Sequence, residues 1–148
     1  MKAVLQRVSR AEVRVDGNVT GQIGRGFLVL LGVSVGDTDT DLNWIVEKII
    51  HLRIFPNDAG KFDRSLLDIN GQVLVVSQFT LFGDCRKGRR PGFTEAAPPE
   101  IADPFFQKAV AAFQAKGIPT QAGIFGAMME VELINDGPVT LILDSRMV

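Results

Sequence analysis

Four residues that could support ester chemistry, Ser77, Gln78, Phe79 and Thr80, stand where an apolar segment of the chain ends. Strand ends that face a loop hold polar groups rigidly and leave them accessible. Two hydroxyls, an amide and the backbone N–H groups here could stabilise the oxyanion that develops during acyl transfer. Thr80 could instead be a nucleophile, which would require a neighbouring general base. The alternative is a polar strand end whose hydroxyls satisfy backbone groups.

The chain offers few partners for such chemistry, because it contains one histidine, His51, and one cysteine, Cys85. His51 falls roughly half a turn from Leu42 on a predicted helix, so we expect it to point away from the apolar face. Cys85 adjoins basic residues that favour a reactive thiolate, but no histidine stands near it. One histidine and one cysteine are too few for a zinc site of those residue types. We therefore expect both residues to be incidental, with no metal and no cofactor.

A basic run follows the 77–80 segment, with four cationic residues within five positions: Arg86, Lys87, Arg89 and Arg90. An aromatic residue, Phe93, comes shortly after. Cationic groups bind phosphates and aromatic rings stack on unpaired bases, so the pattern favours contact with a single-stranded nucleic acid. The alternative is a solvated charged loop.

Near the C-terminus, Asn135, Asp136, Gly137 and Pro138 separate two strand-like segments. This composition predicts a hairpin turn. The Gly-Pro bond also has access to the cis form, which roughly 5–6% of X-Pro bonds adopt in folded proteins. Taken alone, the segment is a turn.

The elements that would position these groups follow the predicted order β-β-β-α-β-α-β-β-β. Strand patterns occur at 2–15, 19–23, 27–35, 72–81, 120–124, 128–134 and 139–143. The turn Asp16-Gly17 joins the first two. One helix is expected from the 36–40 loop to about Arg53. The other is expected to begin with Asp103 as its cap and Pro104 at its first position, and to end before Gly117.

Two helices cannot cover both faces of a large sheet. We therefore predict an α/β protein of the α+β type with three layers, β/β/α, in which mixed sheets pack face to face and both helices lie on one side. The 148 residues are expected to form a single domain, 1–148. Apolar residues make up 46% and charged residues 22%, which excludes a disordered chain.

Neither a signal peptide nor a membrane span is expected. The longest uncharged apolar segment, 27–35, is too short to cross a bilayer. The N-terminal residues alternate between apolar and polar, which a signal peptide does not. A lone cysteine favours a reducing compartment. We therefore expect a cytoplasmic protein.

Three segments, taken together, are more specific than any one of them: SQFTLF at 77–82, GRRPGFT at 88–94 and NDGPVT at 135–140. With the opening MKAVLQRV, they resemble the D-aminoacyl-tRNA deacylases over essentially the whole chain. That family hydrolyses the ester joining a D-amino acid to the 3′-terminal adenosine of tRNA. The resemblance implies a homodimeric proofreading enzyme with tRNA as its partner. Its site would combine residues 77–80 of one subunit with Gly137 and a cis Pro138 of the other.

This resemblance fits the missing catalytic base. Aminoacyl esters are activated, so an oriented water and a stabilised oxyanion suffice. Backbone N–H groups near Phe79 and Thr80 would bind the oxyanion, and Ser77 and Gln78 would position groups, while Thr80 as a nucleophile stays open. The Gly-Pro pair would exclude the Cβ of an L-amino acid, which leaves glycyl-tRNA as a further substrate. Two alternatives are a non-catalytic dimeric RNA-binding module and a threonine-dependent hydrolase of small acyl esters.

Overall fold

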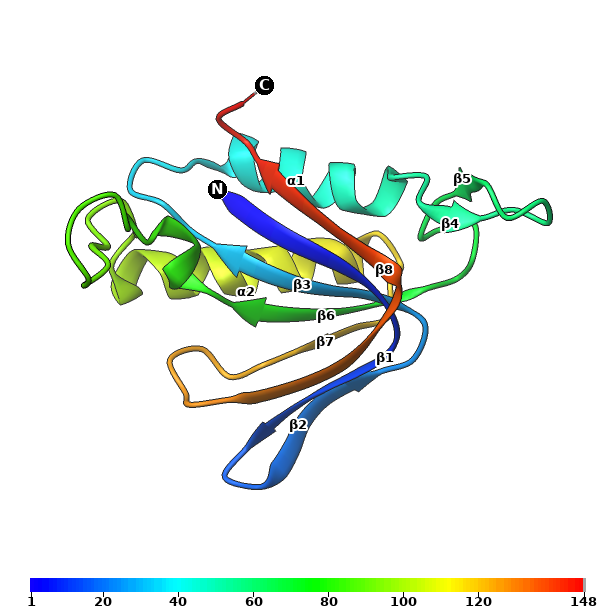
Figure 1. Ribbon diagram of the computed structural model, residues 1–148, viewed down its shortest axis with the longest axis horizontal. Helices are drawn as coiled ribbons and strands as arrows, with labels where there is room; N and C mark the ends of the chain where they lie inside the picture. Colours follow the sequence, from blue (N-terminus) through cyan, green and yellow to red (C-terminus); the bar gives the residue numbers. More distant parts are fainter. Residues whose placement is uncertain (148) are drawn as a thin grey trace.

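The computed structural model describes residues 1–147 and contains two α-helices, a six-stranded sheet and a two-stranded hairpin (Figure 1). In chain order the elements are β1 (Lys2–Val15), β2 (Asn18–Ile23), β3 (Gly26–Gly32), α1 (Asp39–His51), β4 (Phe55–Pro56), β5 (Phe62–Arg64), β6 (Gln72–Ser77), the 3-10 helix η1 (Phe79–Phe82), α2 (Pro99–Ala115), β7 (Thr120–Ala122) and β8 (Glu130–Asp144). Within residues 1–147, neither helix is long and apolar enough to cross a membrane.

The main sheet is mixed and curls nearly into a barrel. Its order is β2-β1-β3-β6-β7, and β8 pairs with β1. The first half of β1 pairs with β3 and the second half with β2, so this long strand continues around the bend of the sheet. The two edge strands β2 and β7 approach each other closely, because a Cβ added at Gly21 of β2 would lie 2.9 Å from the carbonyl oxygen of Ala122 in β7. The prediction of two separate stacked sheets was therefore wrong, since a single bent sheet supplies both layers.

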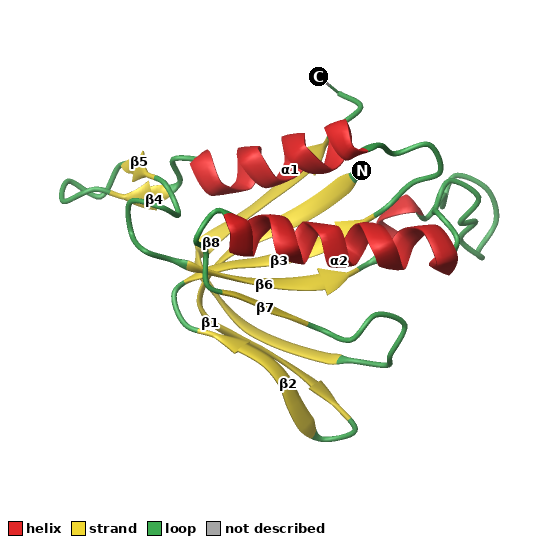
Figure 2. Ribbon diagram, turned by 180° about the vertical axis from the view of Figure 1, so that it is seen from behind, coloured by secondary structure: helices red, strands yellow, loops and turns green. Residues whose placement is uncertain are grey.

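Both helices cover the same face of the sheet, as predicted (Figure 2). Successive residues of β3 serve two cores, because side chains alternate between the faces of a strand. Phe27 and Val29 pack in the cluster that includes the helices, whereas Leu28 packs with Leu74 inside the curl. Burial on both faces explains the unbroken apolar pattern of this strand.

The first helix begins and ends close to its predicted bounds. Thr38 is its N-cap, and the carboxylate of Asp41 accepts a hydrogen bond of 2.8 Å from the Thr38 backbone N–H. Its buried stripe is the predicted one: Leu42, Ile45, Val46, Ile49 and Ile50. The side chain of His51 is 59% exposed, so it lies outside the core as expected.

The hairpin within residues 54–71 and the start of the second helix differ from the prediction. The segment 54–71 adds the hairpin β4–β5, which the sequence pattern did not indicate. The second helix begins at Pro99 rather than after Asp103, because the extended Pro98 caps it and proline suits the first helical position. The N–H groups of Ile101 and Ala102 already donate to the Pro98 carbonyl at 2.9 Å.

The last two predicted strands form one strand, β8, so the hairpin turn expected between them does not exist. β8 pairs with β1 on both sides of the Gly-Pro segment: Asn135 lies opposite Val8, and Thr140 lies opposite Gln6. Four residues of β8, 136–139, therefore bulge out opposite Arg7. The chain keeps its direction because β1 continues to supply hydrogen-bonding partners beyond the bulge.

Candidate active site

The end of β6 borders the main cavity of the molecule, with a volume of about 740 Å³. Four segments supply its walls: the end of β3, residues 76–79, residues 93–102 and residues 125–131. The lining residues are Val33, Val76, Ser77, Gln78, Phe79, Phe93, Ala96, Ala97, Pro98, Pro99, Ala102, Phe125, Gly126, Ala127, Met128, Met129 and Val131. Three of the four predicted catalytic residues, Ser77, Gln78 and Phe79, therefore border a mostly apolar pocket.

The chain leaves the sheet at Gln78 and turns into η1, so the predicted strand 72–81 is shorter than expected. Gly32 permits this turn, because a Cβ there would lie 3.0 Å from both the Gln78 carbonyl oxygen and the Phe82 ring. The Gln78 N–H still donates to the Leu31 carbonyl at 2.8 Å. Thr80 thus sits in a 3-10 turn beyond the strand end.

Two backbone donors beside the pocket lack acceptors. Leu81 N–H donates to the Gln78 carbonyl at 3.3 Å and Gly83 N–H to the Thr80 carbonyl at 2.9 Å. Within residues 1–147, no backbone or side-chain group accepts from the N–H of Phe79 or of Thr80. Both residues are exposed and begin η1, and the first N–H groups of a helix have no partner within it, so these two adjacent donors are available to an oxygen atom of a ligand.

The side chains of this segment are ordered with respect to one another. Gln78 Nε2 donates to Thr80 Oγ1. Phe79 is 53% exposed, and its ring meets the Phe93 ring edge-on with centroids 5.1 Å apart. The single histidine, His51, lies at the far end of α1 against Glu47, so it supplies no base here. Cys85 is exposed and does not line the pocket.

The basic run forms a loop whose base is fixed. Asp84 and Gly92 exchange backbone hydrogen bonds of 2.7 and 2.9 Å. Arg86 forms a bidentate ion pair with Asp84: its Nε donates to the carboxylate at 2.8 Å and its Nη2 at 2.7 Å. These bonds hold the pKa of Asp84 well below its usual range.

The other cations of this loop are free for a ligand. Lys87, Arg89 and Arg90 are exposed, and none forms an ion pair within the described part of the chain. Phe93, at the end of the same loop, lines the pocket. The loop therefore presents three cations without an ion-pair partner among residues 1–147, and the loop ends at Phe93 on the cavity wall, whereas Arg86 is paired with Asp84.

The Gly-Pro segment is exposed and tightly held. The Gly137–Pro138 bond is cis. Asn135 braces the bulge by accepting from the Val139 N–H at 2.7 Å. Arg7, which is buried, donates to the Asp136 carbonyl at 2.8 Å and to the Ile54 carbonyl at 2.6 Å. The sequence analysis did not identify this buried arginine, although Arg7 is in phase with the buried Ala3 and Leu5, so the alternation of β1 could have indicated its face.

One chain does not bring its two predicted site segments together. Ser77 pairs with Leu31 of β3, whereas Arg7, opposite the bulge, pairs with Phe27 four residues away. The four-residue offset separates the Gly-Pro segment from Ser77 by roughly 13 Å along the strands. The three strand spacings from β8 through β1 and β3 to β6 separate them by roughly 14 Å across the sheet. Gly137 and Pro138 therefore lie at the opposite end of the sheet from Ser77 and Thr80.

Comparison with known proteins gives consistent matches. The family model described as D-Tyr-tRNA(Tyr) deacylase matches residues 4–144. The chain is 60% identical over 145 residues to the D-aminoacyl-tRNA deacylase of Roseiflexus castenholzii, covering 98% of this chain and 92% of that one. It is 56% identical over 146 residues to the D-aminoacyl-tRNA deacylase of Desulfitobacterium hafniense, covering 99% and 98%.

Solved structures share the fold. The c-Myc DNA unwinding element binding protein superposes with a TM-score of 0.92 at 44% identity, covering 97% of this chain and 98% of that one. A probable eukaryotic D-amino acid tRNA deacylase superposes with a TM-score of 0.84 at 18% identity, covering 96% and 97%. The full-length family match and the relatives above half identity lead to one conclusion: this chain belongs to the D-aminoacyl-tRNA deacylase family.

Proposed function

We propose that this protein hydrolyses the ester between a D-amino acid and the 3′-terminal adenosine of tRNA, releasing both, and that it also acts on glycyl-tRNA. Family membership supports the reaction class. The observation that carries the assignment to a site is the pair of free N–H groups of Phe79 and Thr80 beside the apolar pocket. Because tRNA is the substrate, the cytoplasm is the expected compartment.

In this proposal the pocket receives the aminoacylated adenosine. An apolar cavity with a few polar groups at one edge is the usual form of a small-ligand site. The free cations Lys87, Arg89 and Arg90 flank it, so they would meet the phosphates of the single-stranded acceptor end. Phe93, and Arg86 after release from Asp84, complete the predicted tRNA-binding set.

The hydrolysis would proceed by direct attack of water on the ester carbonyl. The carbonyl oxygen becomes an oxyanion bound by the N–H groups of Phe79 and Thr80, and the ribose oxygen leaves with a proton. Ser77 and Gln78 would position the ester and the water. The vicinal ribose hydroxyl would accept a proton from the attacking water while it passes its own proton to the departing ribose oxygen. No general base lies beside Thr80, which favours this path over an acyl-enzyme on its hydroxyl.

Rejection of L-amino acids would come from a second copy of the chain. The pocket end lacks an element that could test the configuration of the Cα, and the braced Gly137-Pro138 segment lies at the far end of the same sheet. A homodimer that places this segment of one subunit over the pocket of the other would complete the site. A rigid backbone there would collide with an L-oriented Cβ and ignore the rest of the side chain.

The decisive experiment compares D-tyrosyl-tRNA and L-tyrosyl-tRNA as substrates for the purified protein. We expect release of D-tyrosine and no measurable release of L-tyrosine. Binding of uncharged RNA without turnover would support the RNA-binding module instead. Equal turnover of a free D-tyrosine ester without tRNA would support the small acyl-ester hydrolase.

A further inference from the structure

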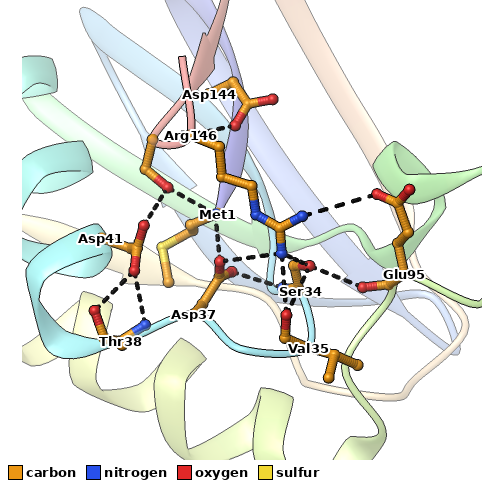
Figure 3. A network of polar contacts seen from close by, with 10 residues as sticks. Met1, Ser34, Val35, Asp37, Thr38, Asp41, Glu95, Asp144 and Arg146 are labelled. Carbon is orange, nitrogen blue, oxygen red and sulfur yellow. Dashed lines mark hydrogen bonds and ion pairs between the residues drawn. The ribbon is translucent and has the colours of Figure 1, made fainter. Parts of the chain in front are cut away.

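A polar network lies at the C-terminal end of β8 (Figure 3). Its centre is Arg146, whose NH2 donates to Ser34 Oγ and, at 3.0 Å, to the Val35 carbonyl oxygen. Its NH1 lies 3.9 Å from Glu95 Oε2. One guanidinium therefore spans two segments that are distant in sequence, 34–35 and 95.

These two segments form one wall of the pocket. The Ala97 N–H donates to the Val33 carbonyl at 2.9 Å, and the Val35 N–H donates to the Glu95 carbonyl at 3.1 Å. Val33 and Ala97 both line the cavity, and so does Ala96, which forms an isolated β-bridge with Ser34. The wall is thus a short two-stranded unit, and Arg146 contacts it through Ser34, Val35 and Glu95.

Ser34 relays the contact across that unit. Its side chain is buried, with 1% of the residue exposed, and its Oγ accepts from Arg146 while donating to the Glu95 carbonyl at 2.9 Å. A hydroxyl that accepts from a charged donor becomes a better donor in turn. Removal of the guanidinium would take away the ion pair with Glu95 and the charged donor to Ser34, which leaves residue 95 held by the Ser34 hydroxyl and the Val35 N–H.

The arginine itself is anchored on both sides. The preceding residue, Ser145, donates to Asp41 Oδ1 at 2.7 Å, which fixes the tail to α1. The buried carboxylate of Asp37 accepts from the Ser34 N–H at 2.6 Å and lies 3.8 Å from Arg146 NH2. The Arg146 side chain is 43% exposed, yet residues 34–37 and Glu95 contact its guanidinium, and α1 holds the preceding residue.

We infer that Arg146 is a positioning residue for substrate binding: by joining the 34–35 and 95 segments, it sets the shape of the pocket wall that faces the aminoacylated adenosine. This inference rests on the proposed function, because it takes the pocket to be the substrate site. It assigns Arg146 no role in the chemical step or in the choice between D and L substrates.

The test compares Arg146→Met with Arg64→Met. Arg64 is a matched control, because it is 44% exposed and pairs only with Asp58 on the β4–β5 hairpin. For Arg146→Met we expect KM for D-tyrosyl-tRNA to rise about three- to ten-fold, the effect of losing a partly exposed charged donor, with kcat within about two-fold. The ratio of D to L turnover should stay unchanged. Arg64→Met should match the parent protein.

A readout independent of turnover separates this inference from the proposed function. In Arg146→Met, hydrogen exchange at the Val35 and Ala97 amides should accelerate, whereas exchange at the Val75 amide in β6 should not. Arg146→Lys, which offers one compact donor group, should recover only part of the loss in KM. The inference is overturned if KM and both wall amides are unaffected, or if exchange accelerates equally at Val75. An inactive parent protein would instead refute the proposed function.

Discussion

The two ends of the curled sheet differ in whether their polar and charged groups have partners within the chain. At the β6 end, an apolar pocket adjoins two backbone donors without acceptors and three cations without counterions. At the opposite end, the exposed Gly137-Pro138 segment has its neighbouring groups bonded to Arg7 and Asn135. The first end therefore has a cavity, donors and charges available to a ligand, while the second presents an exposed backbone segment that its neighbours hold in place.

In the proposed function these two ends have different roles, and two copies of the chain bring them together. Free donors and charges can hold an ester and its phosphates, but they do not distinguish the two configurations at the Cα. A braced backbone can make that distinction, because it yields little to a misplaced methyl group. The following predictions test these roles, beginning with the largest expected effect.

Glycyl-tRNA tests whether the Gly137-Pro138 segment rejects L-amino acids by collision with their Cβ. Glycine has no Cβ to collide with Gly137 or Pro138, so glycyl-tRNA should be deacylated while L-alanyl-tRNA is spared. We expect a ratio above about 200, which exceeds what affinity for a single methyl group usually provides. Initial rates on the two matched substrates measure it. Equal protection of both substrates would mean that rejection does not depend on the Cβ.

The hydroxyl of Thr80 and the amide of Gln78 test the chemistry at the pocket end. Thr80→Val and Gln78→Ala should each lower kcat about ten-fold, with tRNA affinity nearly unchanged, if they position groups in the transition state. Loss of a true nucleophile would lower kcat by roughly 10⁴-fold or more. Single-turnover kinetics and a search for an acyl-enzyme decide between these outcomes. Full activity of Thr80→Val would remove the hydroxyl from the mechanism.

The basic loop tests whether the pocket end meets RNA phosphates. Lys87→Ala combined with Arg89→Ala should flatten the dependence of log affinity on log salt by about 1.4, at about 0.7 for each contact with single-stranded RNA. Arg86→Ala should change the slope less, because Asp84 already neutralises that guanidinium. Filter binding of uncharged tRNA over a salt series gives the slopes. An unchanged slope in the double variant would place the loop away from RNA.

The smallest effect concerns the anchoring of the C-terminal tail. Hydrogen bonds from Ser145 and then from the Thr38 backbone lower the pKa of Asp41 from 3.8 to about 2. A lowered carboxyl pKa stabilises the fold above pH 3.8, and that contribution disappears as the pH falls towards 2. Asp41→Asn should therefore unfold more easily at pH 7, by less than about 1 kcal/mol because the group is partly solvated.

Urea titrations of both proteins at pH 7 and near pH 2 measure this difference. The two free energies of unfolding should converge at the lower pH. A difference that stays constant over the whole range would show that the Asp41 charge does not stabilise the tail.

The sequence predicted the local elements well where one signal governed them. The Asp16-Gly17 turn, the apolar stripe of α1 and the helix stop before Gly117 follow from turn chemistry, helical period and backbone freedom. The cis bond before Pro138 was also expected, on the strength of the family resemblance. Two helices and a mixed sheet were confirmed, although their order was not fully correct.

The tertiary structure decided where these pieces meet. Residues 136–139 resemble a hairpin turn, but pairing with β1 on both sides makes them a bulge. The wall residues Ala96 and Ala97 and the brace Arg146 carry no local signal, since their roles depend on partners more than 30 residues away. For Arg7 the alternation of β1 indicates the face but not the distant partner. Sequence patterns report on neighbours within a turn or a strand. A pocket and its supports depend on how the sheet curls, which long-range pairing and packing determine.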